Sequence, residues 1–571
     1  MVQTIRLKIN GTETDLPWSD FVSNIESTDT AVKLYEYFDT AFILQCSTLL
    51  FLMQAGFILM ETGSLSTKRR VNALILKNLG DTILCAFFYF LIGYGLSYGE
   101  GEKFGGKSGF IGVGEPLCGD AGSCKSKEYS LMFFRFLKTA TSVTILSGIV
   151  AERVHLWVYY LLVTFSSTFS LPLLARWTNH PSGWAYPYQL GGNIFNLKTG
   201  VLDFAGVGEI NVAGALPALI LLPLIGPRWQ RFQGEWRDMR LPAQNDYFKT
   251  LGTTIMWMSW YGLVFGGVTT LRGNGGAVVA KIAVNTTVSA VAASIVAIAC
   301  GLYYEKKMCP SDASNGILSG LVGITGACAT VETEWALFIG MVSGLIYFSL
   351  TKVFLNLKID DVVEGVQIHL CCGVWSLIAP ALFSSRQLVK VAYPHFKDES
   401  SVPCGILYQC DGLGAAQLGA NLLYCLFLFL WIGATSGLLI LPLWYFNLIR
   451  YKLKTDGEDN HSEDLVTQSE VSDTGSLIHD VGVDPEEVRL EAVQEVTSQE
   501  IATSNSILHE TDQDKEMLRD GSTSGEPGLS VQLGSKSEID PLAVAALEQI
   551  RTVYPDIGSD DIGRSAEGLS S

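Results

Sequence analysis

The chain has 571 residues, of which 48% are hydrophobic and only 17% are charged. A large soluble protein usually carries a larger share of charged residues, so this composition favours a protein with many membrane spans. The net charge of −18 is concentrated at one end, because residues 451–571 hold 8 Lys and Arg against 27 Asp and Glu. Such an acidic tail argues against binding to nucleic acid.

Three regions follow from this distribution. Residues 1–40 are polar and contain no apolar signal-peptide core, so they are expected to form an extracellular N-terminal segment. Residues 41–450 contain long apolar runs and are expected to form the membrane domain. Residues 451–571 are poor in aromatic side chains and rich in Ser, Glu, Asp and Thr, which predicts a mostly disordered cytoplasmic tail.

The membrane domain is predicted to be an all-α polytopic bundle with eleven spans. A span needs about 20 predominantly apolar residues to cross the hydrocarbon core. The candidate spans lie near residues 41–62, 78–98, 131–152, 156–175, 204–225, 249–270, 278–303, 315–330, 336–356, 363–384 and 417–447.

Lys and Arg near the span ends indicate the orientation, because cytoplasmic connections carry an excess of them. They follow the first, fifth, seventh and eleventh spans, which all end on one side if the N-terminus is outside. The members of this set are Lys68, Arg69, Arg70, Arg228, Arg231, Arg237, Arg240, Lys306, Lys307, Arg450, Lys452 and Lys454. We therefore expect a multi-pass plasma-membrane protein with an extracellular N-terminus and a cytoplasmic C-terminus.

Two other features agree with this orientation. Asn10 begins an Asn-Gly-Thr glycosylation sequon on the proposed outer side. Cys118 with Cys124, and Cys404 with Cys410, lie close together in loops assigned to the outside, where disulfides persist. Free thiols remain the alternative for each pair.

Ionisable residues within spans are costly and usually mark a pathway through the bundle. Arg135, Lys138, Glu209 and His369 lie within spans, and Asp203 lies at the start of one. His369 is predicted to line a pathway, with a buried structural hydrogen bond as the alternative. The neighbouring cysteines favour packing over metal binding, and no metal-ligand cluster, phosphate loop or dinucleotide fingerprint predicts a metal, a cofactor or an enzyme.

Ordered motifs between residues 38 and 450 resemble the ammonium transporter (Amt/Mep/Rh) family. The segment opening with Asp203-Phe204-Ala205-Gly206 and closing with Gly226-Pro227-Arg228 is similar to that family's signature. Further matches, in chain order, are Gln54-Ala55-Gly56-Phe57, Glu61-Thr62-Gly63-Ser64, Ser147-Gly148, Ala151-Glu152-Arg153, Trp260-Tyr261-Gly262, Asn285-Thr286-Thr287, Asn315-Gly316, Gly320-Leu321-Val322, Ile359-Asp360-Asp361 and His369 with Cys372-Gly373.

The resemblance implies two inverted five-helix halves plus a C-terminal helix, assembled as a homotrimer with one pore in each protomer. It also implies ammonium or ammonia as the permeant. In this family a vestibule with an aromatic ring, two stacked phenylalanines and a pair of histidines line the path, and an aspartate orders the vestibule. Ammonium is attracted to an aromatic face, and a histidine relay can accept its proton.

Two of these positions are retained here. Asp203 matches the vestibule aspartate, and His369 matches the second histidine of the pair. Asn211 stands where the resemblance expects the first histidine, and an amide cannot pass a proton onward as imidazole can. The recruiting tryptophan's position holds Asn179, although Trp177 lies nearby.

The remaining departures place charge and aliphatic groups at the expected pore entrance. Lys138 replaces the outer phenylalanine, and Arg135 replaces a nearby glutamine. Leu263 stands at the inner phenylalanine's position and Gly267 at the vestibule serine's. A lysine at the entrance would oppose a cation by about 4 kcal/mol at 4 Å and an effective dielectric near 20.

Glu209, two residues before Asn211, offers a counter-charge. Our hypothesis is that a Lys138–Glu209 or Arg135–Glu209 pair neutralises the charge and plugs or narrows the path. The alternative is that the match of this helix to the family pattern is wrong by one helical turn, so that Lys138 reaches towards the lipid headgroups. Phe134 and its neighbours would then supply the entrance ring.

Within the tail, residues 540–553 read as a short helix that offers a face to a cytoplasmic partner, or as a transient helix. Asp473 to Ile478 weakly resembles an acidic dileucine sorting signal.

The leading function predicted is transmembrane transport of ammonium or ammonia through an atypical pore. The alternatives are a non-conducting sensor or scaffold that signals through the tail, and a channel with a changed permeant.

Overall fold

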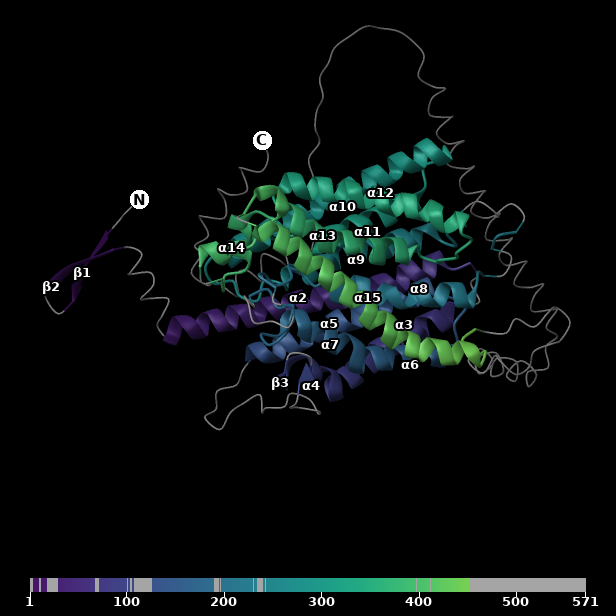
Figure 1. The fold of residues 1–571 in the computed structure, drawn as a ribbon, viewed down its shortest axis with the longest axis horizontal. Helices are drawn as coiled ribbons and strands as arrows, with labels where there is room; N and C mark the ends of the chain where they lie inside the picture. Colours follow the sequence, from purple (N-terminus) through teal and green to yellow (C-terminus); the bar gives the residue numbers. More distant parts are fainter. Residues whose placement is uncertain are drawn as a thin grey trace, which may run out of the picture. The chain divides into compact units, whose positions relative to one another are not determined.

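The computed structural model describes residues 4–9, 12–17, 29–66, 71–99, 101–102, 105–106, 126–188, 195, 197–228, 231–233, 240–241, 243–396, 398–410 and 412–450. They lie within one compact unit, Met1–Leu453. The described part is a bundle of long helices that run in similar directions (Figure 1).

Helices cover every one of the eleven expected spans. The first five spans are formed by α2 (Asp29–Ser64), α3 (Val71–Phe88) with η2 (Tyr89–Gly93) and α4 (Tyr94–Tyr98), α5 (Ser126–Ile149), α6 (Leu156–Phe165) with η3 (Ser166–Ser170) and α7 (Leu171–Asn179), and η4 (Gly208–Val212) with α8 (Ala213–Ile225). The other six are formed by α9 (Asp246–Phe265), α10 (Gly275–Glu305), α11 (Pro310–Thr325), α12 (Thr333–Asn356), η6 (Val366–Cys371) with α13 (Cys372–Phe383), and α15 (Leu413–Tyr445). The segments marked η in these two lists are π-helical turns.

In the described part of the chain, 8 helical segments are long and apolar enough to cross a membrane. The three expected spans outside this set are α5, α9 and α11. Helix α5 carries the charges Arg135 and Lys138, and α11 has only 16 residues. The polar sequence of α5 and the short one of α11 suit positions inside the bundle, where neighbouring helices cover them.

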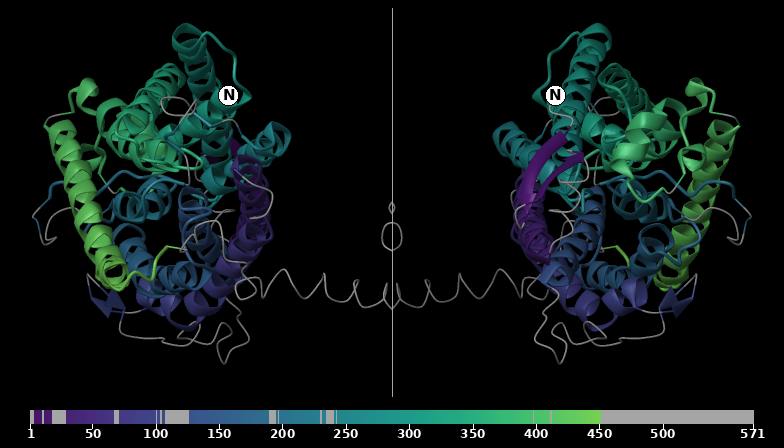
Figure 2. Two further views of the ribbon diagram at one scale, coloured as in Figure 1. Left: turned by 90° about the vertical axis from the view of Figure 1, so that its right-hand side faces the viewer. Right: turned by 90° about the vertical axis from the view of Figure 1, so that its left-hand side faces the viewer.

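The helices divide into two groups of five with α15 laid across them. Viewed along the bundle, the purple and blue helices of the first group lie beside the teal and green helices of the second, and α15 runs along one side (Figure 2). Helix α15 packs against α8 and α13, which are the fifth elements of the two groups. An odd number of spans in the first group means that the second group enters from the opposite side, so the two halves are inverted.

The two halves meet where α2 packs along α9 through small residues. A Cβ atom added at Gly252 would lie 2.3 Å from the backbone nitrogen of Met60, and one at Gly63 would lie 2.5 Å from that of Lys249. Only glycine allows the two helix backbones to approach this closely.

A break in the fifth element of each half positions the centre of the bundle. Asp203 accepts hydrogen bonds from the backbone nitrogens of Val207 (2.8 Å) and Gly208 (2.9 Å), and Asp361 accepts one from Val366 (2.8 Å). Each aspartate therefore satisfies amide groups that the start of a helix leaves without partners. The π-helical turns η4 and η6 follow directly and bring their side chains into the bundle.

The first span begins earlier than the apolar run indicated. Helix α2 starts at Asp29, so the end of the polar segment 1–40 is helical. Asp39 explains this extension, because it pairs with Lys127 (2.7 Å) and accepts a hydrogen bond from the backbone of Leu271 (2.8 Å). Contacts with other elements thus continue the helix beyond the apolar residues.

Small elements outside the spans complete the described chain. They are the hairpins β1 (Thr4–Ile9) with β2 (Thr12–Pro17) and β3 (Gly101–Glu102) with β4 (Gly105–Gly106), helix α14 (Arg386–Ala392), and the 3-10 turns η7 (Glu399–Ser401) and η8 (Ile406–Tyr408).

One of the two expected disulfides is present. Cys404 and Cys410 are bonded, with their Cα atoms 6.1 Å apart. The other pair, Cys118 with Cys124, lies outside the described residues, as do Asn10 and the whole acidic tail with its expected helix and sorting motif.

Candidate permeation site

The two broken helices bring Asn211 and His369 into contact at the centre of the bundle. The Asn211 amide nitrogen lies 3.0 Å from Nδ1 of His369, and the two side chains come from η4 and η6. Both residues are buried, and the ring of Phe57 lies 6.3 Å from the imidazole. With the amide donating, Nδ1 is the acceptor and the neutral ring carries its proton on Nε2.

This pair cannot pass protons along as two histidines can. An imidazole accepts a proton on one nitrogen and releases one from the other, whereas an amide only donates or accepts hydrogen bonds. A proton relay along this line therefore ends at His369.

A second cluster of polar side chains gathers around Glu209, two residues before Asn211 in η4. Glu209 forms an ion pair with Lys138 of α5 and accepts a hydrogen bond from the Asn179 amide at 2.6 Å. The Glu209 side chain is only 7% exposed and that of Lys138 13%. Lys138 therefore turns into the bundle, and the alternative in which it reaches the headgroups is wrong.

Gly206 makes room for this ion pair. A Cβ atom there would lie 2.6 Å from Oε1 of Glu209 and 2.7 Å from Nζ of Lys138. Its φ of +84° also falls in the region that side chains disfavour. The glycine that opens the signature-like segment thus permits both the backbone turn before η4 and the placement of the charges.

Arg135 has different partners from those of Lys138. Its guanidinium lies 3.6 Å from the centre of the Tyr98 ring, and it donates to the Tyr94 hydroxyl at 3.4 Å. A cation held over an aromatic face in this way is stabilised without a carboxylate. Of the two ion pairs expected for Glu209, the structure therefore contains the one with Lys138.

The other residues predicted for the path have packing roles. Leu263 is fully buried, and the ring of Phe134 lies over Gly266 at the end of α9. Trp177 packs against Trp184 and Trp431, with ring centroids 5.9 and 5.6 Å away. Asp203 accepts hydrogen bonds from backbone amides at the start of η4. It acts on the site through these bonds rather than through a side-chain contact with Asn211 and His369.

Sequence reasoning missed two contacts. The Asn179–Glu209 hydrogen bond joins two positions that were identified separately as departures, and Phe57 lies beside His369 although it was noted only as part of a motif. The sequence did contain a signal for the Asn179–Glu209 hydrogen bond, because both residues are polar and a buried carboxylate needs more than one partner.

Across the described residues, no group of three His, Cys, Asp or Glu side chains is placed to hold a metal ion. The polar groups of the site are instead amide side chains, an imidazole and an ion pair whose two charges balance. Such groups can orient and desolvate a small polar molecule.

Fold and site together define a polytopic membrane protein of two inverted halves, in each of which the fifth element is a broken helix. The profile of the Ammonium Transporter Family matches residues 41–465, and the chain belongs to this family. The chain is 30% identical over 444 residues to ammonium transporter 3 of Dictyostelium discoideum, covering 77% of this chain and 96% of that one. It is 35% identical over 367 residues to a putative ammonium transporter of Synechocystis, covering 63% and 79%.

Solved structures share the fold. Mep2 of Candida albicans superposes with a TM-score of 0.62 at 20% identity, covering 78% of this chain and 91% of that one. A protein titled Sensor Amt Protein superposes with a TM-score of 0.61 at 24% identity, covering 74% and 96%.

Proposed function

We propose that this chain moves ammonium or ammonia across a membrane along the line between η4 and η6, and that the Lys138–Glu209 pair narrows this line. Membership of the Ammonium Transporter Family supports the permeant. The observation that carries the site is the contact between Asn211 and His369, because it joins the two broken helices at the bundle centre.

Charge balance makes transport compatible with a lysine in the path. An isolated ammonium group 4 Å from a permeating cation would oppose it by about 4 kcal/mol, close to a thousandfold in occupancy. Glu209 contacts Lys138 directly and cancels most of this field. The pair still occupies space and fixes the surrounding polar groups, so its expected effect is a slow rate and a preference for the neutral species.

A second candidate is a non-conducting sensor or scaffold of the same fold. The observation that favours it is the same buried ion pair, whose rupture costs several kcal/mol and which therefore holds the path in one state. Signals would then pass to the cytoplasmic tail.

The proposal also includes features that accompany the fold. The protein acts as a homotrimer in the plasma membrane, with the N-terminus outside and the C-terminus in the cytoplasm, and it has no enzymatic activity. The arginines after α5 and α8 and at the end of α15 support this orientation, because Arg153, Arg228 and Arg450 gather at one end of the bundle.

Radiolabelled methylammonium uptake, measured with electrical current in ammonium, tests the proposal in cells with verified surface expression. The variants are the wild-type chain, Lys138→Phe with Asn211→His, and Lys281→Met as a control far from the pair. We expect uptake by the wild type above that of cells without the protein, and faster uptake by the double variant.

The other outcomes separate the candidates. No uptake by the wild type, with uptake restored in the double variant, would identify a scaffold that has lost conduction at these residues. Equal uptake by the wild type and the double variant would show that the ion pair does not narrow the path.

A further inference from the structure

The connection between α13 and α15 ends in a turn that a disulfide closes. The bond between Cys404 and Cys410 encloses η8, in which Ile406, Leu407 and Tyr408 are 40%, 56% and 40% exposed. Apolar residues within the spans are exposed because lipid covers them, but this turn lies outside the spans. An exposed apolar patch in such a place marks an interaction site.

The turn lies directly against two spans. The backbone nitrogen of Gly405 donates to the carbonyl of Ser384, just beyond the end of α13, at 2.7 Å. A Cβ atom at Gly405 would lie 2.4 Å from the carbonyl carbon of Leu382. One at Gly414, in the first turn of α15, would lie 2.9 Å from the Cα atom of Ile406. These close approaches fix the turn at the level where α13 ends and α15 begins.

A third span adds aromatic side chains to the same surface. Trp335, in the first turn of α12, donates its indole hydrogen to the Tyr408 hydroxyl at 3.1 Å. It also stacks on Phe383, with the ring centroids 4.6 Å apart. Phe338, one turn further along α12, is 40% exposed and packs edge-on against the same Phe383 ring. We call this surface the turn patch, which consists of Trp335, Phe338, Ile406, Leu407 and Tyr408.

The length of α12 places the turn patch at the membrane boundary. This helix has 24 residues, which span about 36 Å, while the hydrocarbon core is about 30 Å thick. Its first turn therefore lies near the level of the lipid headgroups. Trp and Tyr side chains concentrate at this level, because their rings are apolar and their N–H or O–H groups are polar.

The backbone and the charge of the turn suit the same place. The backbone nitrogens of Tyr408 and Leu413 donate to the carbonyls of Gly405 and Cys410 at 3.0 and 2.7 Å. Paired backbone groups lower the cost of leaving water. The five residues between the two cysteines carry no charge. Glu334, an exposed carboxylate next to Trp335 in the sequence, stands in the first turn of α12, where the span leaves the hydrocarbon.

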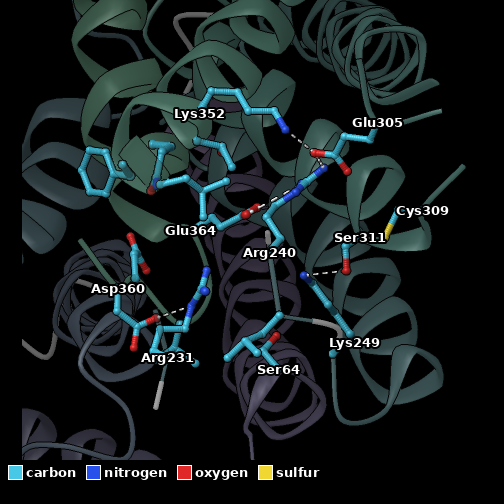
Figure 3. A pocket seen from close by; sticks show the side chains of 18 of the residues that line it. Ser64, Arg231, Arg240, Lys249, Glu305, Cys309, Ser311, Lys352, Asp360 and Glu364 are labelled. Carbon is cyan, nitrogen blue, oxygen red and sulfur yellow. Dashed lines mark hydrogen bonds and ion pairs between the residues drawn. The ribbon is translucent and has the colours of Figure 1, made fainter. Parts of the chain in front are cut away.

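The opposite end of the bundle has a different surface. A cavity of about 500 Å³ lies there, among the ends of α10 and α12 and the starts of α9 and α11. Figure 3 shows that charged side chains line it and pair with one another, as Arg240 and Lys352 do with Glu305 at 2.9 and 2.6 Å. The exposed apolar turn is therefore a feature of one end of the bundle and not of its connections in general.

We infer that the turn patch inserts into the headgroup layer of the membrane and that its partner is the lipid surface. Its depth, its Trp and Tyr side chains and its continuity with the exposed face of α12 favour lipid over a soluble partner. Since the patch is uncharged, the contact does not depend on the charge of the headgroups. The contact holds the ends of three spans at one depth, and it is independent of whether the path conducts.

Photo-cross-linking of the full-length protein in phosphatidylcholine vesicles tests this inference. The photoreactive residue p-benzoylphenylalanine replaces Leu407 in one variant and Phe338 in another, and mass spectrometry identifies the molecule to which each becomes bonded. Matched controls carry it at Leu426, which is 54% exposed within α15, and at Glu399, whose side chain is 72% exposed outside the spans.

We expect lipid adducts at Leu407, Phe338 and Leu426. The yield at Leu407 should exceed that at Glu399 by about tenfold, which corresponds to about 1.4 kcal/mol of preference for the membrane. Vesicles that also contain an anionic phospholipid should give the same yield at Leu407.

Three results would overturn the inference. Bonding of the Leu407 variant to a second copy of the chain, without lipid, would identify a subunit contact. Bonding to neither, while Leu426 gives lipid adducts, would show that the turn faces water. Adducts at Leu407 that need the anionic lipid would show an electrostatic contact instead of an apolar one. Thermal unfolding of each variant identifies a folding defect, and the Phe338 variant, in which one aromatic ring replaces another, then decides whether the patch contacts lipid.

Discussion

Removing one partner of the Lys138–Glu209 pair should destabilise the protein far more than removing both. Glu209→Gln removes the carboxylate that contacts a buried ammonium, and loss of one partner of a buried pair typically costs about 3–5 kcal/mol. Lys138→Met should cost somewhat less, because Glu209 keeps its hydrogen bond from Asn179. The double variant removes both charges and should lie within about 1 kcal/mol of the wild type, or above it.

A double-mutant cycle on the free energy of unfolding, measured in mixed micelles, isolates the coupling between the two side chains. The expected coupling is about 3 kcal/mol or more. Lys281 and Glu332 provide a matched control, because their pair is also short at 2.7 Å but its side chains are 24% and 44% exposed. An exposed pair of this kind contributes about 0.2–1 kcal/mol.

A coupling for Lys138 and Glu209 no larger than that of the control pair would refute the reasoning. It would mean that water or lipid headgroups solvate the charges, and that the path is wider at this point than the described side chains allow. The uptake experiment would then have no reason to favour Lys138→Phe.

Two further predictions concern the surroundings of the site and the end of the bundle. Gly206→Ala should lower the free energy of unfolding by about 1–3 kcal/mol, through its φ of +84° and the crowding of the ion pair, whereas Gly419→Ala, on an open face of α15, should be neutral or stabilising. Burial opposes ionisation of Asp360, but hydrogen bonds and charges from Arg228 and then Arg153 hold its pKa at about 2. Because this pKa lies below the usual value near 3.9, the stabilisation is complete above about pH 4, and about 2–3 kcal/mol is lost as the pH falls through about 2. When the free energy of unfolding is measured against pH, its decrease at acid pH should be absent in Asp360→Asn and present in Asp398→Asn. An unchanged decrease in Asp360→Asn would contradict the assignment.

The helices could be predicted because each span is a long apolar run whose identity does not depend on its neighbours. The more polar α5, with Arg135, Lys138 and several Ser and Thr residues, was found through its apolar residues, such as Leu131, Phe134 and Leu137. The start of α2 at Asp29 was missed for the opposite reason. Its polar first turns are held by Lys127 and Leu271, which are distant in the sequence.

The site was predictable in composition but not in pairing. Arg135 and Lys138 lie three residues apart and so share one face of a helix, and either could have met Glu209. The choice depends on the rings of Tyr94 and Tyr98, which attract the guanidinium of Arg135 and leave Glu209 to Lys138. A single sequence does not encode such a competition among three helices in any local pattern.

Comparison of the two halves indicates which of these residues the fold requires. His369 follows Asp361 by eight residues, as Asn211 follows Asp203, so both sides of the central contact occupy the same place after a capping aspartate. Six residues after each aspartate stand Glu209 in η4 and the neutral Gln367 in η6.

Since η6 makes the same π-helical break with a neutral side chain, the break itself does not need a carboxylate. The charge of Glu209 therefore has to be explained by what it faces, and it faces Lys138 at the expected entrance of the path. The fold does not require this pair of charges, and burying them costs free energy that other interactions must offset. Such a pair points to a role in controlling the path. For this reason the uptake of the Lys138 variant, rather than its stability, decides between a narrowed transporter and a closed scaffold.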